Sequence, residues 1–304
     1  ICVDKRNKNR HRHKKEGISR LFPLFNCVFG CCVSNFILIS VNCSKNTVKL
    51  HRTQRGYIIE FNREYYLSKH VDWDVFVNRE DLFFSLARET EALEPDFALL
   101  TALRTNQLPP IGNQPVWGYW SESSKEVEMP FFYKGNQEIT VGTLANLKPQ
   151  SRDKIHSLSV CLAFFVAKSG QISGVTIAHD VMNLSVFEKN PSVLGFAKNY
   201  NQSLALGPSL VIFDQFPPSF FQVRMEFFRD GSCIQTQHKE IDLHLFELTQ
   251  RIRKIRENRT FIHGFYYLTE PLSIDFSTKV LKSGDLIQTT ILDIGTLKNT
   301  YTHV

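Results

Sequence analysis

Two long apolar stretches joined by a short turn limit how this chain of 304 residues can fold. Ser157–Ala167 and Gln171–Ala178 are separated by a turn-forming Lys-Ser-Gly sequence, which predicts a β-hairpin. A second pair, Phe221–Phe228 and Cys233–Glu240, flanks Asp230-Gly231, a dipeptide typical of tight hairpin turns. The 25 phenylalanines favour strands and aromatic packing over disorder. We therefore expect a β-rich α+β fold.

The remaining apolar patterns predict further strands and two helices. A short hairpin is expected near the N-terminal side, and apolar residues at helical spacing predict the helices. The predicted strands are Val48–His51, Tyr57–Phe61, Glu64–His70, Gly264–Leu268 and Asp285–Leu292, and the predicted helices are Arg79–Leu93 and Leu243–Asn258. Prolines at 95, 109 and 110 bound a linker. We therefore divide the chain into a leader (1–45), a small N-terminal β-rich domain (46–108) and a main domain (109–304).

The positive charge lies at the N-terminal end. The chain has a formal charge of +6, and residues 1–20 alone carry eight Lys or Arg against two acidic residues. The other 28 basic and 28 acidic residues cancel, so no nucleic-acid partner is expected for the folded body. Residues 21–44 contain no charge, which is compatible with a signal peptide or membrane anchor, or with a poorly structured leader. A nucleic-acid-binding arm is a third interpretation of the basic run.

Cysteine usage favours a reducing, cytoplasmic location for the body, with a secretory or membrane-anchored location as the alternative if residues 1–44 act as a targeting segment. Five of the seven cysteines precede residue 44. Only Cys161 and Cys233 lie in the body, and no C-x-x-C pair indicates a zinc site.

One segment combines a carboxylate with a lysine in a pattern that suggests chemistry. The apolar strand Val175–Ala178 is expected to place Asp180 at its end, and the chain then loops back through Lys198 before a further strand, Ser209–Phe213. A carboxylate at a strand end beside a lysine is a plausible site for an anionic, metal-bound ligand. A turn-forming Asp and a solvated Lys are the structural alternatives. His179 is either a metal ligand or general base, or a hydrogen-bonded structural histidine.

This segment resembles the fumarylacetoacetate hydrolase family, and within it the 2-keto-3-deoxy sugar-acid (arabinonate-type) dehydratases. That branch carries the segments G-Y-T-x-G-N-D-x-S-x-R-D, E-N-P-L and A-K-x-Y-x-x-x-x-x-L-G-P. The matching residues are Gly174, Thr176, Asp180, Glu188, Asn190, Pro191, Leu194, Ala197, Lys198, Tyr200, Leu206, Gly207 and Pro208. The resemblance extends backwards to Leu108-Pro109-Pro110-Ile111 and forwards to Ile294-Gly295-Thr296-Leu297.

The resemblance implies a mixed β-roll that holds Mg²⁺ or Mn²⁺ and acts on a 2-oxo acid, as a carbon–carbon hydrolase or a dehydratase. In such a site the metal chelates the carboxylate and carbonyl of the substrate and stabilises an enolate. By resemblance, Asp180 is a metal ligand, Lys198 the catalytic lysine, and Thr269 and Tyr200 substrate-binding residues. Members of the family pair as homodimers, and the phenylalanine-rich stretch Phe221–Phe228 would otherwise offer an exposed surface.

Several family residues are replaced in this chain. The family has two metal-binding glutamates in an E-x-E motif, where this chain has Ser159-Val160-Cys161. The T-G-T-G loop has become Thr269-Glu270-Pro271-Leu272, which removes glycines that allow close backbone approach. Two hypotheses follow: a Mg²⁺-dependent hydrolase or dehydratase of a 2-oxo sugar acid with reduced or lost activity, and a catalytically dead member acting as a binding or structural protein.

Overall fold

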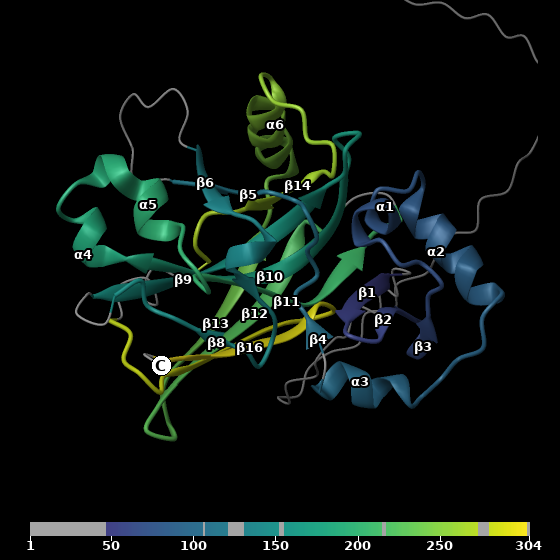
Figure 1. Ribbon diagram of the computed structural model, residues 1–304, viewed down its shortest axis with the longest axis horizontal. Coiled ribbons are helices and arrows are strands. Elements are labelled where there is room, and N and C mark those ends of the chain that lie inside the picture. Colours follow the sequence, from purple (N-terminus) through teal and green to yellow (C-terminus); the bar gives the residue numbers. More distant parts are fainter. Residues whose placement is uncertain are drawn as a thin grey trace, which may run out of the picture. The chain divides into compact units, whose positions relative to one another are not determined.

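The computed structural model describes residues 47–105, 107–120, 131–151, 155–214, 217–272 and 280–302 (Figure 1). The chain divides into two units, 1–44 and 45–304, and all described residues belong to the second. The predicted leader, 1–45, lies outside them. In the part of the chain that is described, no helix is both long and apolar enough to cross a membrane.

Two sheets form the framework of the second unit. The larger sheet has 11 strands, with the order β3-β2-β1-β11-β10-β9-β14-β5-β6 and with β4 on β1 and β7 on β11. Its strands are β1 (Val48–Thr53), β2 (Gly56–Phe61), β3 (Glu64–Leu67), β4 (Gln107–Leu108), β5 (Val116–Tyr119), β6 (Phe131–Gly135), β7 (Thr140–Val141), β9 (His156–Val166), β10 (Ile172–Asn183), β11 (Leu204–Ile212) and β14 (Phe265–Leu268). Most pairs are antiparallel, whereas β5–β14 and β7–β11 are parallel, so the sheet is mixed.

The smaller sheet has five strands in the order β13-β12-β15-β16-β8. They are β8 (Asn146–Leu147), β12 (Phe220–Arg229), β13 (Ser232–Asp242), β15 (Leu286–Ile291) and β16 (Gly295–Tyr301). Helices pack around the two sheets (Figure 1). They are α1 (Trp73–Val77), α2 (Leu82–Glu91), α3 (Leu99–Thr105), α4 (Leu184–Phe187), α5 (Leu194–Lys198) and α6 (Leu245–Arg256), with two 3₁₀ turns, η1 (Gln137–Ile139) and η2 (Pro191–Val193).

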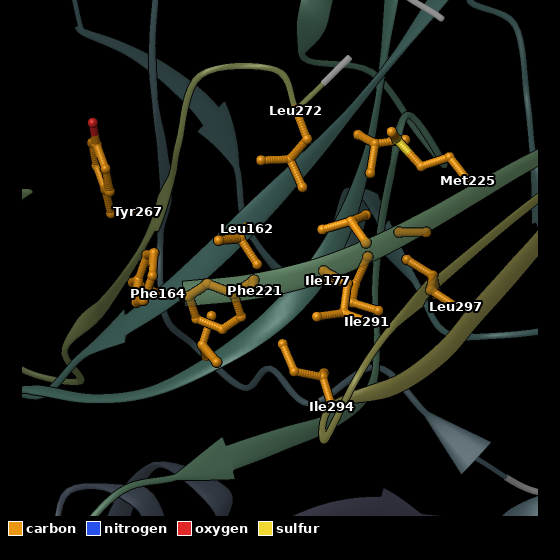
Figure 2. Packing of buried hydrophobic residues seen from close by; sticks show 14 of the residues in the cluster. Leu162, Phe164, Ile177, Phe221, Met225, Tyr267, Leu272, Ile291, Ile294 and Leu297 are labelled. Carbon is orange, nitrogen blue, oxygen red and sulfur yellow. The ribbon is translucent and has the colours of Figure 1, made fainter. Parts of the chain in front are cut away.

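The core lies between the two sheets, and β9 and β10 run through it. Leu162 and Ile177 from the larger sheet meet Phe221, Met225 and Ile291 from the smaller one (Figure 2). Every residue of β9 is buried, and so are 11 of the 12 residues of β10. A strand covered on both faces needs a continuous apolar run instead of an alternating pattern, and this explains the composition of the first predicted hairpin.

The hairpins predicted from the sequence are confirmed. β9 and β10 pair along their whole lengths, and Gly170 takes the positive φ of +97° that the turn requires. In the β12–β13 hairpin, Asp230 and Gly231 both have positive φ, as the turn types that favour Asp-Gly demand. The prediction of where β10 ends was wrong: the strand continues to Asn183, because its pairing with β9 continues to that residue. Asp180 therefore lies inside a strand.

The argument that linked phenylalanines to a dimer surface does not hold for most of β12. Phe221 and Phe227 are buried in the core between the sheets, and only Phe220 at the start of the strand is half exposed. The homodimer itself stays a prediction.

The predicted N-terminal domain is hydrogen-bonded into the larger sheet. β1 pairs with β2 on one side and with β11 on the other, so the sheet continues from residues 48–67 into the main domain. The proposed boundary at residue 108 stays a prediction.

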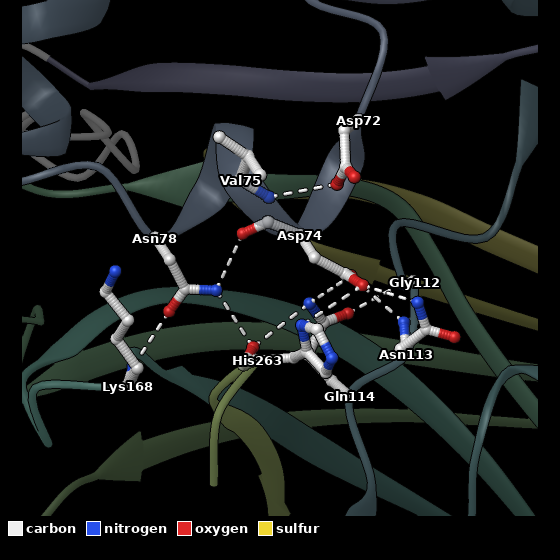
Figure 3. A network of polar contacts seen from close by, with 9 residues as sticks. All are labelled: Asp72, Asp74, Val75, Asn78, Gly112, Asn113, Gln114, Lys168 and His263. Carbon is white, nitrogen blue, oxygen red and sulfur yellow. Dashed lines mark hydrogen bonds and ion pairs between the residues drawn. The ribbon is translucent and has the colours of Figure 1, made fainter.

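A buried carboxylate ties helix α1 to the start of the main domain. Asp74 accepts hydrogen bonds from the backbone N–H of Asn113 at 3.0 Å, from the Asn113 side chain at 2.6 Å and from Gln114 Nε2 at 2.7 Å (Figure 3). A side chain at Gly112 would have its Cβ 2.1 Å from Asp74 Oδ1, so only glycine fits this close approach. Asn78, one turn further along, donates to the backbone oxygen of His263 at 2.9 Å and so extends the network to the turn before β14.

Replacing Asp74 by alanine is expected to destabilise the protein by about 2–4 kcal/mol, because the buried Gln114 amide and two donors of the exposed Asn113 lose their acceptor. The matched control is Asp72→Ala on the same helix, which removes only the N-cap bond to Val75 N and should cost about 1 kcal/mol. Urea denaturation of both variants measures the difference. Equal losses would contradict the importance assigned to the Asp74 network.

His179 is a structural residue that joins the two sheets. It is fully buried on β10; its Nδ1 lies 2.9 Å from Asn299 Oδ1 and its Nε2 2.9 Å from Thr289 Oγ1. The Asn299 amide donates to Gly142 O and Ala145 O, which fixes Oδ1 as an acceptor from the histidine. His179 therefore holds its proton on Nδ1 and accepts from the threonine hydroxyl.

Protonation of His179 should weaken the fold at acid pH. Burial lowers the pKa of His179 from 6.5 to about 4, although the bond to Asn299 opposes this shift. The unfolded chain therefore takes up the proton at higher pH than the folded chain does. Stability from this residue is complete above pH 6.5 and is lost as the pH falls from 6.5 through 4, by about 3 kcal/mol in total. The unfolding free energy, measured from pH 6.5 to pH 4, should fall with pH in the wild type and fall less in His179→Gln. An equal fall in that variant would assign the loss of stability to other groups.

Candidate functional site

The β9–β10 register brings Asp180 to the position that the sequence comparison indicated. Asp180 pairs directly with Ser159, and Ala178 pairs with Cys161, so these four residues share one face of the sheet. Asp180 and Cys161 are each 2% exposed. The residues that stand in place of the family glutamates therefore do lie beside Asp180.

Two lysines close around the Asp180 carboxylate. Lys198, at the end of α5, places Nζ 2.5 Å from Asp180 Oδ2. Lys134, on β6, places Nζ 2.8 Å from Oδ1. Both ammonium groups are buried, and Lys134 is fully so. The structure thus brings together the predicted pair, Asp180 and Lys198, and adds a third member that sequence reasoning missed. The signal that could have indicated Lys134 is a lone charge inside the aromatic run Phe131–Gly135.

The Lys134 ammonium lies among oxygen atoms. Besides Asp180 Oδ1, it donates to Val181 O at 3.0 Å, to Ser203 Oγ at 3.1 Å and to Lys198 O. The contact with Asp180 Oδ1, at 2.8 Å, is an ion pair between buried groups. Lys134 is thus held by one negative and three neutral oxygens.

The electrostatics of the centre follow from burial and from the two ammonium groups. Burial alone would raise the pKa of the Asp180 carboxyl, but Lys134 and Lys198 more than offset it and hold the pKa below its usual value. Burial lowers the pKa of Lys134 to about 8, and Asp180 opposes that shift. The carboxylate is therefore ionised at neutral pH and Lys134 is mainly protonated.

Aromatic rings enclose the two lysines. Lys198 Nζ lies 5.6 Å from the ring centre of Trp120 and 5.2 Å from that of Phe132, and Lys134 Nζ lies 5.9 Å from that of Tyr200. Tyr200, predicted to bind substrate, is thus part of the centre. Its hydroxyl is buried without a hydrogen-bond partner among the described residues. Burial raises its pKa, and Tyr301 and Asp180 raise it further, so the hydroxyl stays protonated and can donate.

Thr269, the other predicted substrate-binding residue, lies at a different place. Its Oγ1 accepts from the backbone N–H of Leu162 at 3.2 Å and donates to Glu270 O at 2.9 Å. It lines a cavity of about 220 Å³ together with Tyr267 and Arg251 of α6. The role predicted for Thr269 stays a prediction.

The residues around Asp180 do not fit a divalent cation. Mg²⁺ prefers several hard oxygen ligands, and the one carboxylate that the described residues place here has an ammonium group at each oxygen. Burial raises the pKa of the Cys161 thiol, which keeps it protonated and a poor ligand. In the described part of the chain, no three His, Cys, Asp or Glu side chains gather in a way that could hold a metal ion.

Comparison with known sequences gives one partial match. No protein-family model matches the chain. A stretch of 140 residues is 28% identical to the probable 2-keto-3-deoxyxylonate dehydratase of Haloferax volcanii. This stretch makes up 46% of the chain and spans about half (48%) of that relative.

Solved structures match over a larger part of the chain. A 2-keto-3-deoxy-D-arabinonate dehydratase, in complex with magnesium and 2,5-dioxopentanoate, superposes with a TM-score of 0.67 at 21% identity, covering 85% of this chain and 99% of that one. A fumarylacetoacetate hydrolase from Exiguobacterium antarcticum gives 0.57 at 15% identity, covering 85% and 100%. The resemblance predicted from the sequence is confirmed at the level of the fold: this chain has the mixed β-rich α+β fold of the fumarylacetoacetate hydrolase and 2-keto-3-deoxy sugar-acid dehydratase proteins.

Proposed function

We propose that this protein binds a small 2-oxo acid of the sugar-acid type at Asp180, Lys134 and Lys198, and that it has little or none of the metal-dependent hydrolase or dehydratase activity implied by its resemblance. One observation carries the proposal. A single buried carboxylate lies between two buried ammonium groups, at 2.5 Å and 2.8 Å. Among the described residues, two ammonium groups against one carboxylate leave the centre with one positive charge in excess.

An excess buried charge is costly unless a partner of opposite sign compensates it. The carboxylate of a 2-oxo acid supplies that charge, and its neighbouring carbonyl oxygen can accept a hydrogen bond from the Lys198 ammonium. The same two groups are what a divalent ion would chelate in a metal-dependent relative.

One further group suits a hydroxyl of a sugar acid. The Tyr200 hydroxyl is a buried donor without a hydrogen-bond partner among the described residues. Buried polar atoms are normally paired, so a hydroxyl of this kind beside two cations favours a polar, anionic ligand. The solved dehydratase with 2,5-dioxopentanoate offers a ligand of this class for testing.

The loss of activity follows from what is missing beside Asp180. Ser159 and Cys161 occupy the positions next to the carboxylate and bring no negative charge. Enolate stabilisation would depend on the two ammonium groups, which act through hydrogen bonds and a single charge each and do not coordinate the oxygen as a divalent Lewis acid does. Turnover of a 2-keto-3-deoxy sugar acid is therefore expected to be low and insensitive to added Mg²⁺.

Titration calorimetry with chelator-treated protein should show binding of pyruvate and tighter binding of 2,5-dioxopentanoate. Lys198→Met should weaken both by about 10- to 100-fold, because a charge-assisted hydrogen bond contributes roughly 1.5–3 kcal/mol. The control is Lys239→Met, which removes an ammonium group that donates to Leu272 O beside the Thr269 cavity.

Two results would contradict the proposal. One is the absence of heat with either acid for a folded wild-type protein. The other is binding that requires Mg²⁺, or that is lost equally in the Lys239 control.

A further inference from the structure

The Lys134 ammonium contacts the carboxylate that the resemblance assigns to a metal ion. It lies against Asp180 Oδ1, on the face of the sheet that carries Ser159 and Cys161. From this position we infer that Lys134 is a built-in cation, whose ammonium group replaces a divalent ion at Asp180. The inference concerns the centre described above but stands whether or not a 2-oxo acid binds there.

The oxygen atoms around Lys134 Nζ suit an ammonium group better than a doubly charged ion. One carboxylate oxygen, two backbone carbonyl oxygens and one hydroxyl surround it, from Asp180, Val181, Lys198 and Ser203. Only one of these four atoms carries a negative charge, and the Lys198 ammonium pairs with the same carboxylate. The two ammonium groups already exceed that charge by one, and a doubly charged ion added to them would raise the excess to three.

A divalent ion and the Lys134 ammonium exclude one another. A metal bound to Asp180 Oδ1 would lie within a few ångströms of Nζ, and two cations this close in a buried site repel strongly. The Lys134 side chain is 0% exposed in its present position, so it cannot turn its charge toward water there. The metal could bind only if the whole side chain left its buried position.

The neighbouring side chains agree with this replacement. Two glutamates at 159 and 161 would help to neutralise a divalent ion, whereas without the ion they would change the charge of the centre from one positive to one negative. The serine and cysteine found there are small, neutral and buried. Neutral residues at 159 and 161 are therefore what a centre needs when ammonium groups, and no divalent ion, pair with Asp180.

The first test removes the ammonium group and offers a substitute. Lys134→Ala should unfold at a lower temperature than the wild type, because it leaves buried oxygens without a donor. n-Propylammonium, which resembles the deleted part of the side chain, should raise the melting temperature of this variant and leave that of the wild type unchanged. Tetramethylammonium, which cannot donate hydrogen bonds, should not. Lys49→Ala, which removes a partly exposed ammonium group 3.4 Å from Glu60, is the matched control.

Equal effects of n-propylammonium on Lys134→Ala, Lys49→Ala and the wild type would overturn the inference.

The second test asks whether Lys134 blocks a metal, and it does not depend on the stability of the alanine variant. Mn²⁺ binding is compared in Ser159→Glu/Cys161→Glu and in the same double variant with Lys134→Met. The triple variant should bind Mn²⁺ at least about tenfold more tightly, which corresponds to about 1.4 kcal/mol. The double variant should gain little over the wild type, because Lys134 and Lys198 pair with the new carboxylates.

Equal Mn²⁺ affinity of the double and triple variants would overturn the inference. If the triple variant does not fold, the wild type decides the question. If the wild type binds Mn²⁺ and Asp180→Asn does not, a metal binds at Asp180 while Lys134 is present, and the inference is overturned. The absence of such binding supports the inference. These tests use cations only, so they can fail while 2-oxo acid binding succeeds, and the reverse.

Discussion

The pairing of β9 with β10 fixes the positions on which the rest of the structure depends. Its register sets which residues of β10 face the smaller sheet and which face away from it. Ile177 and His179 point to the smaller sheet, where they build the core and join the sheets. Asp180 points to the opposite face, beside Ser159 and Cys161. A shift of one residue would exchange the two sets and bury the carboxylate in the apolar core.

The cost of burying Asp180 explains why lysines from distant segments converge on it. An ionised carboxylate removed from water needs charged or hydrogen-bonding partners. Lys198 follows Asp180 in the sequence by 18 residues, whereas Lys134 comes from β6, which is separated from β9 in the sheet by β14 and β5. Its contact with Val181 O shows that the sheet curls and brings its last strand over β10. The centre therefore depends on the curvature of the sheet as well as on its register.

Local patterns in the sequence predicted those parts of the fold that are determined by residues close together in the chain, such as hairpin turns. The two hairpins were predictable because Asp230-Gly231 and Gly170 supply the positive φ angles that their turns require. The proximity of Asp180 and Lys198 was predictable from the resemblance to a family. Lys134 was not, because its burial results from a contact between strands distant in sequence. Asp74 was missed for the same reason: its partners, Asn113 and Gln114, lie about 40 residues further along the chain.

The central claim is that the cation at Asp180 is the ammonium group of Lys134. A crystal structure of the wild-type protein grown with Mn²⁺ and pyruvate, with data collected at the manganese absorption edge, tests it most directly. We predict no anomalous peak at the Asp180 carboxylate, Lys134 Nζ in contact with Oδ1, and pyruvate beside the two lysines. A manganese peak bound to Asp180, with the Lys134 side chain moved away, would contradict the account.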